Sequence, residues 1–151
     1  MAAPRILPDS GVFLEGILSP WSTSRGILIL ARCAIFKVLF AEYVRREVER
    51  NLFELLARDS RLGSESVDAY GKLVRLLRPK IIALPAREEV DAVRHLIHHQ
   101  ADVPGLASAL AMRPDYLGTT NTRHFTAELA RRAALTIVTP TQLIARITIV
   151  D

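Results

Sequence analysis

Short runs of aliphatic and β-branched residues alternate with longer amphipathic segments along most of the chain. The short runs are typical of buried strands, and apolar residues spaced three or four apart are typical of helices. Strands that alternate with helices form a parallel sheet covered on both faces. The sequence therefore predicts an α/β protein with three layers, α/β/α, and a central parallel sheet of about five strands. The predicted strands are 5–8, 36–40, 80–84, 115–119 and 135–138.

Helical patterns occupy the intervals between these strands. Thr139 and Gln142 predict a capping box at the start of the last helix, and Pro140 fits its first turn. The segment 58–65 is predicted as a loop. The other predicted helices are 11–18, 24–33, 42–57, 87–99 and 125–133, with one more ending near 77 and one beginning at 103. Because 151 residues is an ordinary domain length and no linker interrupts the pattern, a single domain over 1–151 is expected.

Composition excludes some classes of protein and favours one kind of partner. The longest apolar stretch is interrupted by Arg32 and Lys37, so no membrane span is expected, and no signal peptide is predicted. The single cysteine, Cys33, cannot form an internal disulfide, which favours a reducing cytoplasm. Arginine supplies 17 of the 20 basic residues, and its planar fork suits phosphate. Ordinary solvated surface charge explains the same composition equally well.

Polar residues follow two of the predicted strands. Asp9 closes the first strand in "ILPDSG", and Asn121 follows the fourth in "LGTTNTRHF". In parallel sheets, ligands bind outside the carboxyl ends of the strands, where these two side chains are expected. Asp9 is equally suited to be a turn former or helix cap.

Helical periodicity separates one glutamate from the others in the helix 42–57. Val44, Val48 and Leu52 define an apolar face, and Glu47 falls at its margin. A carboxylate at the edge of a core is costly to leave unpaired, which makes Glu47 a candidate for a metal site or a polar network. Pairing with a neighbouring arginine remains the alternative.

Asp102 precedes "VPGLASALAM" and suits the N-cap of that helix. The helix dipole keeps a carboxylate ionised there, so capping and metal binding are compatible roles. Together these oxygen donors predict a site for Mg²⁺ or Mn²⁺, and such an ion can promote phosphodiester cleavage.

Three stretches carry a resemblance to a known family: "ILPDSGVFLEGILSP", "FKVLFAEYVRREVERNL" and "DVPGLASALAMRPDYLGTTNTRHF". In their order and spacing they resemble blocks of the PIN domain family, which includes the VapC-type toxin ribonucleases, and the resemblance spans nearly the whole chain. It implies an endoribonuclease that depends on Mg²⁺ or Mn²⁺ and cuts RNA with metal-activated water. It also implies a common role as the toxin of a toxin–antitoxin pair, a homodimer, and an antitoxin protein as partner.

The resemblance assigns roles to individual residues. Asp9, Glu47 and Asp102 fall on the acidic metal-binding and catalytic positions, and Asn121 stands where many members have aspartate. Asn121 is expected to support the metal through its amide oxygen. The predicted substrate contacts are Ser10 and Thr119, from the resemblance, and Arg25, Arg123 and His124, from their expected places near the crevice.

Three alternatives stay open. Asn121 and Pro8 depart from the family pattern, so a catalytically degenerate PIN domain that binds RNA or a protein partner without cleavage is the second interpretation. A nucleotide-binding α/β domain is the third, although no glycine-rich phosphate loop supports it. Separately, His95 and His99 are four residues apart on a predicted helix, a spacing that can hold zinc, but the sequence suggests no further ligands.

Overall fold

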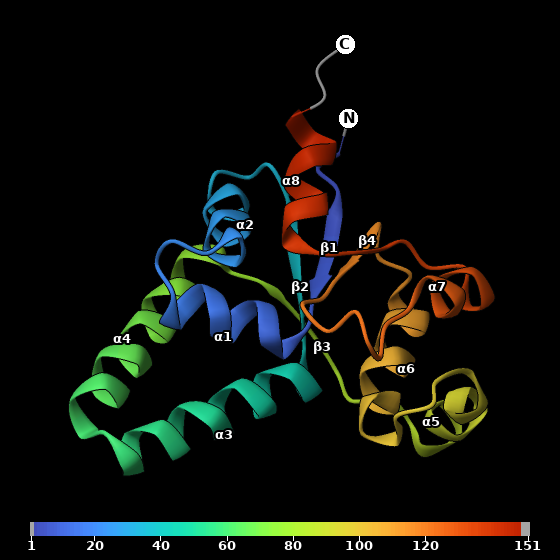
Figure 1. Ribbon diagram of the computed structural model, residues 1–151, viewed down its shortest axis with the longest axis horizontal. Helices are drawn as coiled ribbons and strands as arrows, with labels where there is room; N and C mark the ends of the chain where they lie inside the picture. Colours follow the sequence, from blue (N-terminus) through green and yellow to red (C-terminus); the bar gives the residue numbers. More distant parts are fainter. Residues whose placement is uncertain (1, 149–151) are drawn as a thin grey trace.

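The computed structural model describes residues 2–148 and has a parallel sheet at its centre (Figure 1). The strand order is β3-β2-β1-β4-β5, and every neighbouring pair is parallel, which confirms the predicted sheet. The strands are β1 (Arg5–Pro8), β2 (Lys37–Ala41), β3 (Lys80–Ile82), β4 (Tyr116–Gly118) and β5 (Ile137–Val138).

Helices cover both faces of the sheet. The helices between β1 and β3 lie on one face of the sheet, and those between β3 and β5 lie on the other (Figure 1). The first group is α1 (Ser10–Leu18), α2 (Thr23–Arg32), α3 (Glu42–Arg58) and α4 (Ser60–Leu77). The second is α5 (Arg87–Val93), the 3₁₀ turns η1 (Arg94–Leu96) and η2 (Gln100–Asp102), α6 (Val103–Met112) and α7 (Ala127–Ala133). The last helix, α8 (Pro140–Thr148), packs against α2.

The strand order reverses between β1 and β4. From β1 the chain proceeds through β2 to β3 on one side, then crosses to β4 on the other side of β1. Pro8 is in register with Gly118, and the backbone N–H of Asp9 donates to the Gly118 carbonyl at 2.8 Å. The residues that follow β1 and β4 therefore lie side by side at the point where α/β sheets ordinarily bind ligands.

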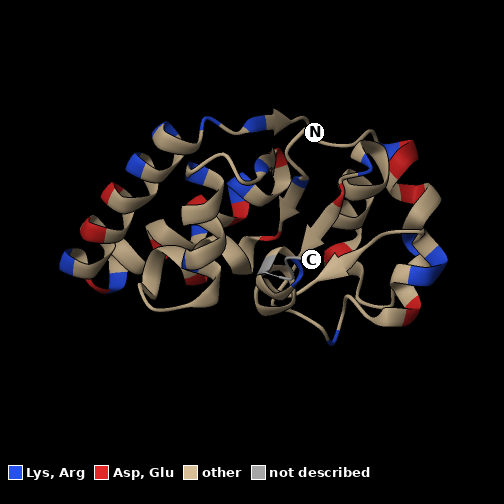
Figure 2. Cartoon of the chain, turned by 90° about the horizontal axis from the view of Figure 1, so that it is seen from above, with Lys and Arg blue, Asp and Glu red and all other residues tan. Residues whose placement is uncertain are grey.

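The core fills both faces of the sheet. Ile6, Leu7 and Phe40 are almost fully buried, and the Phe13 and Phe40 rings meet with centroids 4.6 Å apart. Each such side chain contributes about 1.5–3 kcal/mol by its removal from water. Lys, Arg, Asp and Glu lie mostly along the outer helices (Figure 2). Within residues 2–148, no helix combines the length and the apolar character needed to cross a membrane.

Two predicted elements are wrong. The segment 58–65 is almost wholly helical, because Asp59 caps α4 by accepting from the Leu62 N–H at 3.0 Å. Gly63 lets α4 lie directly against the backbone of Leu56 in α3, where a Cβ would not fit. The predicted helix 87–99 ends at Val93 and continues only as the turn η1, so residues 97–99 are not helical.

Candidate functional site

A cavity of about 280 Å³ lies at the carboxyl ends of β1 and β4, where α1, α3 and α6 begin. Residues from both helical layers form its walls. The four residues predicted as metal ligands all line this cavity: Asp9, Glu47, Asp102 and Asn121. Ser10 also lines it. The structure therefore brings together side chains that span more than a hundred positions of the sequence.

Asp9 is fixed through both of its carboxylate oxygens. Oδ1 accepts from the Val12 N–H at 3.0 Å and so caps α1, while Oδ2 accepts from the hydroxyl of Thr119. Burial raises the pKa of Asp9, and the carboxylates of Glu47 and Asp102 add to the rise, although the two hydrogen bonds lower it. Asp9 thus caps a helix and faces the cavity as well.

Thr119 lies beneath the cavity and not on its wall. Its side chain is 1% exposed, and its Oγ1 also accepts from the Asn121 N–H at 2.9 Å. The predicted contact between Thr119 and substrate does not fit this burial. The hydroxyl instead forms hydrogen bonds to both Asp9 and the backbone of Asn121, and so fixes their relative positions. The neighbouring Thr120 lines the cavity.

Glu47 enters the cavity from α3. In the described part of the chain, no Lys or Arg lies within 4.0 Å of its carboxylate. Tyr43, one turn earlier, lines the same cavity and donates from its hydroxyl to the Ala101 carbonyl at 2.8 Å. Burial, with the charges of Glu47 and Asp102, raises the pKa of Tyr43. The i, i+4 spacing from Glu47 is the sequence signal that could have identified Tyr43.

Asp102 ends η2 and stands at the N-cap position of α6, but its side chain makes no capping hydrogen bond. Its carboxylate is only 22% exposed. Oδ2 turns toward two imidazoles, 2.6 Å from Nδ1 of His124 and 3.2 Å from Nδ1 of His99. The structure confirms the predicted N-cap position of Asp102, and the predicted capping bond is wrong.

Asn121 lines the cavity while its amide holds the turn after β4. Oδ1 accepts from the His124 N–H at 3.3 Å, and Nδ2 lies 2.8 Å from the His124 Nδ1. The amide that stands in the place of a carboxylate is therefore engaged with His124.

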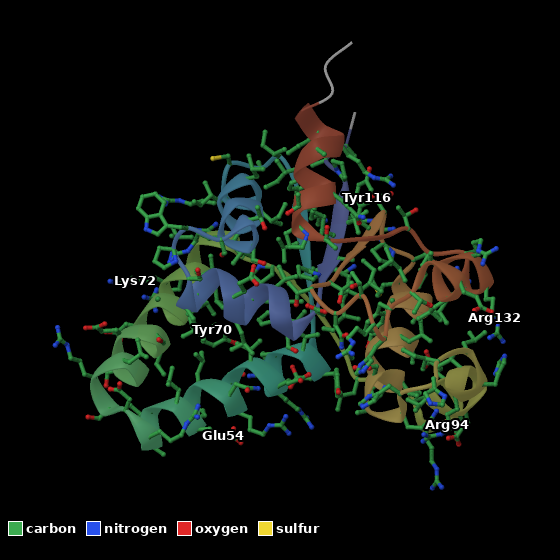
Figure 3. All side chains as sticks on the ribbon, in the orientation of Figure 1. Glu54, Tyr70, Lys72, Arg94, Tyr116 and Arg132 are labelled. Atoms are coloured by element: carbon green, nitrogen blue, oxygen red, sulfur yellow. The ribbon has the colours of Figure 1, made fainter. Side chains whose placement is uncertain are left out.

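The remaining predicted substrate residues are divided between two other places. Arg123 and His124 line an adjacent cavity of about 520 Å³, which also includes His99 and Arg132. Arg132 projects from α7 on the same side of the sheet as Arg94 (Figure 3). Arg25 lies away from both: its Nε donates to the Gly16 carbonyl at 2.5 Å, and it borders a third cavity between α2 and α4.

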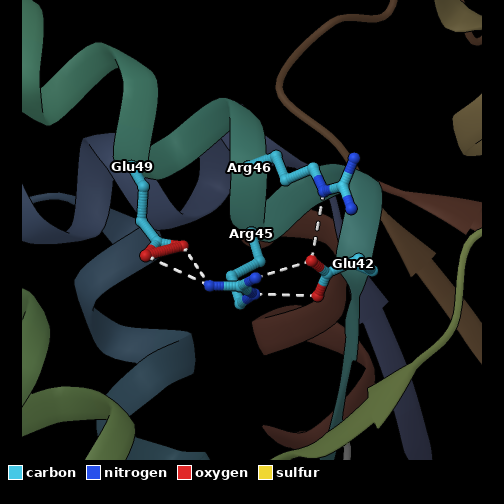
Figure 4. A network of polar contacts seen from close by, with 4 residues as sticks. All are labelled: Glu42, Arg45, Arg46 and Glu49. Carbon is cyan, nitrogen blue, oxygen red and sulfur yellow. Dashed lines mark hydrogen bonds and ion pairs between the residues drawn. The ribbon is translucent and has the colours of Figure 1, made fainter.

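The opposite face of α3 carries acidic residues in a different setting. Arg45 donates to Glu42 at 2.6 Å and to Glu49 at 2.7 Å, and Arg46 also donates to Glu42, at 3.1 Å (Figure 4). The hydrogen bond from Arg45 is the largest of the contributions that lower the pKa of Glu42 to about 2. The charges of these carboxylates are therefore neutralised by arginines of the same helix.

Solved structures share this arrangement of strands and helices. VapBC2 from Rickettsia felis, in a crystal structure with a DNA fragment from its promoter, aligns over 89% of this chain and 98% of its own, with a TM-score of 0.64 and 16% identity. PAE2754 from Pyrobaculum aerophilum aligns over 97% of this chain and 90% of its own, with a TM-score of 0.61 and 14% identity. No protein-family model and no curated protein matches the sequence.

The fold is PIN-like. At these identities the likeness concerns the path of the chain, so the chemistry of the cavity rests on its own residues. In this PIN-like fold, the residue after β1, the helix α3, the residue before α6 and the turn after β4 each contribute one carboxylate or amide side chain to the cavity. Carboxylate and amide oxygens are the donors that hard divalent cations prefer.

Proposed function

We propose that the chain is an endoribonuclease that depends on Mg²⁺ or Mn²⁺. One observation carries the proposal: Asp9, Glu47 and Asp102 converge on one cavity, and no Lys or Arg pairs with any of them in residues 2–148. Like charges gathered in this way repel one another and are costly without a counter-charge, and the charges of Glu47 and Asp102 contribute to the raised pKa of Asp9. A divalent cation offsets that cost, and the oxygen donors fit Mg²⁺ or Mn²⁺.

The three carboxylates would hold the ion, with Asn121 as a supporting ligand through its amide oxygen. When bound, a divalent cation supplies Lewis acidity that activates water and offsets the negative charge developing on a phosphodiester. The chain supplies the orientation. The Thr119 hydroxyl holds Asp9 in place by a hydrogen bond. The Tyr43 hydroxyl donates to the carbonyl of Ala101 and so connects α3, which carries Glu47, to the segment that carries Asp102.

The RNA would extend from the acidic cavity toward its larger neighbour. Arg123, His124 and Arg132 line that neighbour, and guanidinium groups bind phosphate oxygens well. Ser10 lies on the wall of the acidic cavity, where its hydroxyl can donate to a phosphate oxygen. Arg25 has no place in this path, because it borders a different cavity.

We further propose that the chain is the toxin of a toxin–antitoxin pair in the cytoplasm, as a homodimer with an antitoxin protein as partner. The likeness of the fold to VapBC2 and the three sequence stretches support this role. Expression in a bacterial host is expected to arrest growth, and the Glu47→Gln variant is expected to relieve the arrest. Arrest that is equal for both proteins would contradict the toxin role.

The decisive experiment is cleavage of a labelled single-stranded RNA by the purified chain in Mg²⁺, Mn²⁺ or EDTA. We expect cleavage only with metal, and a loss of at least about a hundredfold in Glu47→Gln. Glu49→Gln is the matched control: it makes the same change two residues along α3, away from the cavity, and should retain activity. Cleavage in EDTA, or equal rates in the two variants, would overturn the assignment.

One observation favours a second function, RNA or protein binding without cleavage. The amide of Asn121 is engaged with His124. Asn121 therefore brings no negative charge to the cavity, and its amide oxygen already accepts a hydrogen bond from the His124 N–H. Calorimetry with Mn²⁺ separates the two functions. Binding that disappears in Asp102→Ala supports the nuclease, and the absence of Mn²⁺ binding in the wild type supports the degenerate domain.

A further inference from the structure

A second group of potential metal ligands lies beside the acidic cavity. His99 lies between η1 and η2, Asp102 ends η2, and His124 belongs to the turn after β4. Their ligand atoms all lie within 4.8 Å of one another. The two imidazole rings stack at 14° with centroids 4.0 Å apart, so both Nδ1 atoms face the same carboxylate oxygen.

That oxygen, Asp102 Oδ2, is buried and has no hydrogen-bond partner in the described part of the chain. The short distances to the imidazoles therefore lack the geometry of a hydrogen bond. A buried carboxylate oxygen that accepts no hydrogen bond is costly, and such a group calls for an explanation. Together with the two ring nitrogens beside it, this oxygen forms a set of donors suited to a cation.

The donors of this cluster differ from those of the acidic cavity. Two imidazole nitrogens and one carboxylate suit zinc and related divalent transition metals, whereas Mg²⁺ prefers oxygen alone. Three protein ligands with an open fourth position are typical of accessible zinc sites. His99 and His124 line the cavity of about 520 Å³, which gives an ion a path of entry and room for a water or an anion.

We propose that His99, Asp102 and His124 bind Zn²⁺ through the two Nδ1 atoms and Oδ2. The ion would take the Nδ1 lone pair of His124 that the Asn121 amide now approaches at 2.8 Å. The competing occupant is a proton on His124, which would give an imidazolium–carboxylate pair with no affinity for metal. This inference goes beyond the nuclease, because zinc binding is measured without RNA.

Asp102 belongs to both groups of ligands. It lines the acidic cavity and presents Oδ2 to the imidazoles. A single carboxylate can bind two ions through its two oxygens, so zinc at the histidines would act on the acidic site through Asp102. His95, the other member of the pair predicted from sequence, is not part of this cluster.

The test is calorimetry of the full chain, stripped of metal by a chelator, with ZnCl₂ at neutral pH. We expect one Zn²⁺ per chain and affinity weakened at least about tenfold in His99→Ala and in His124→Ala. His98→Ala is the matched control, since His98 is an exposed neighbour outside the cluster. Equal affinity in wild type, His98→Ala and His99→Ala would overturn the proposal, as would absence of zinc binding.

Further measurements separate zinc binding at the histidines from misfolding and from binding in the acidic cavity. His124→Ala also alters the turn that Asn121 holds, so His99→Ala, on a separate segment, carries the test, with circular dichroism to confirm folding. Co²⁺ in place of Zn²⁺ should give visible absorption bands in the wild type that His99→Ala lacks. Glu47→Gln should leave zinc affinity unchanged; a loss as large as that in His99→Ala would place the ion in the acidic cavity and overturn the proposal.

Discussion

The acidic side chains on the two faces of α3 differ in whether they are paired with arginine. On one face, Glu42 and Glu49 are held by Arg45 and Arg46, and the pKa of Glu42 falls to about 2 (Figure 4). On the other, Glu47 faces a cavity, and no Lys or Arg within residues 2–148 pairs with it. Both faces belong to one helix of 17 residues.

The contrast shows how a carboxylate can be kept ready for a ligand. On the face that carries Glu42 and Glu49, glutamates and arginines at i, i+3 and i, i+4 form ion pairs with one another. At the cavity, the neighbours of Glu47 are other carboxylates and the Tyr43 hydroxyl, which is already bonded to Ala101. The negative charge there remains available to a cation.

Placing an arginine on the cavity side of α3 should remove the difference between the faces. Tyr43→Arg sets a guanidinium four residues before Glu47, the spacing that joins Arg45 to Glu49. We expect Mn²⁺ affinity to fall about 10- to 100-fold by calorimetry, because the arginine neutralises the site. Tyr43→Phe is the control: it loses the hydrogen bond to Ala101 but keeps the charge. If both variants bind Mn²⁺ alike, neutralisation is not the cause.

Adding a carboxylate should strengthen the difference. Asn121→Asp places a fourth negative charge on the cavity wall, and we expect about tenfold tighter Mn²⁺ binding by calorimetry because affinity rises with ligand charge. Thr120→Asp adds the same charge one residue away and should have a smaller effect. An unchanged affinity in Asn121→Asp would show that the side chain at 121 does not reach the ion.

In metal-free protein, the cavity acids should reduce stability. The folded pKa of Asp9 lies above its unfolded value, so the ionised form costs stability that is absent at low pH and is felt fully once pH exceeds the folded pKa. We expect Asp9→Asn to raise the free energy of unfolding by about 1 kcal/mol at pH 7 in EDTA. Urea denaturation should show that gain shrinking toward pH 3. A loss at pH 7 would mean that the capping and Thr119 hydrogen bonds outweigh the charge.

The arginine-paired face of α3 should show the reverse pH dependence, with the smallest effect. Because the folded pKa of Glu42 is about 2, below its unfolded value, the pairing stabilises the fold above pH 5 and is lost as pH falls toward 2. Glu42→Gln should lower the melting temperature slightly at pH 7 and make no difference near pH 2. A drop that persists at pH 2 would contradict an electrostatic origin.

The sequence was most informative where simple geometric rules place side chains. Asp9 and Asn121 follow adjacent parallel strands, whose carboxyl ends must meet at one edge, and the period of α3 brings Glu47 toward the same side. Asp102 was located by its place before α6, although its side chain does not cap that helix. These predictions needed the direction of each element and no detail of packing.

Predictions failed where the length of an element decided the outcome. Arg25 follows α1, and nine helical residues advance the chain about 14 Å, which carries it away from the cavity. The predicted pair of His95 and His99 required a helix that ends at Val93, and His124, the actual neighbour of His99, comes from another segment. The Ser- and Gly-containing segment 58–65 is helical because Gly63 packs against Leu56.

The hydrogen bond between Thr119 and Asp9 joins residues 110 positions apart. During synthesis, Asp9 and Glu47 leave the ribosome long before Asp102, and the turn that holds Asp9 in place is made later still. A growing chain therefore carries only a partial set of cavity residues until Asn121 has been translated. For a protein proposed to cut RNA, this order of assembly delays the complete site until the turn after β4 has been made.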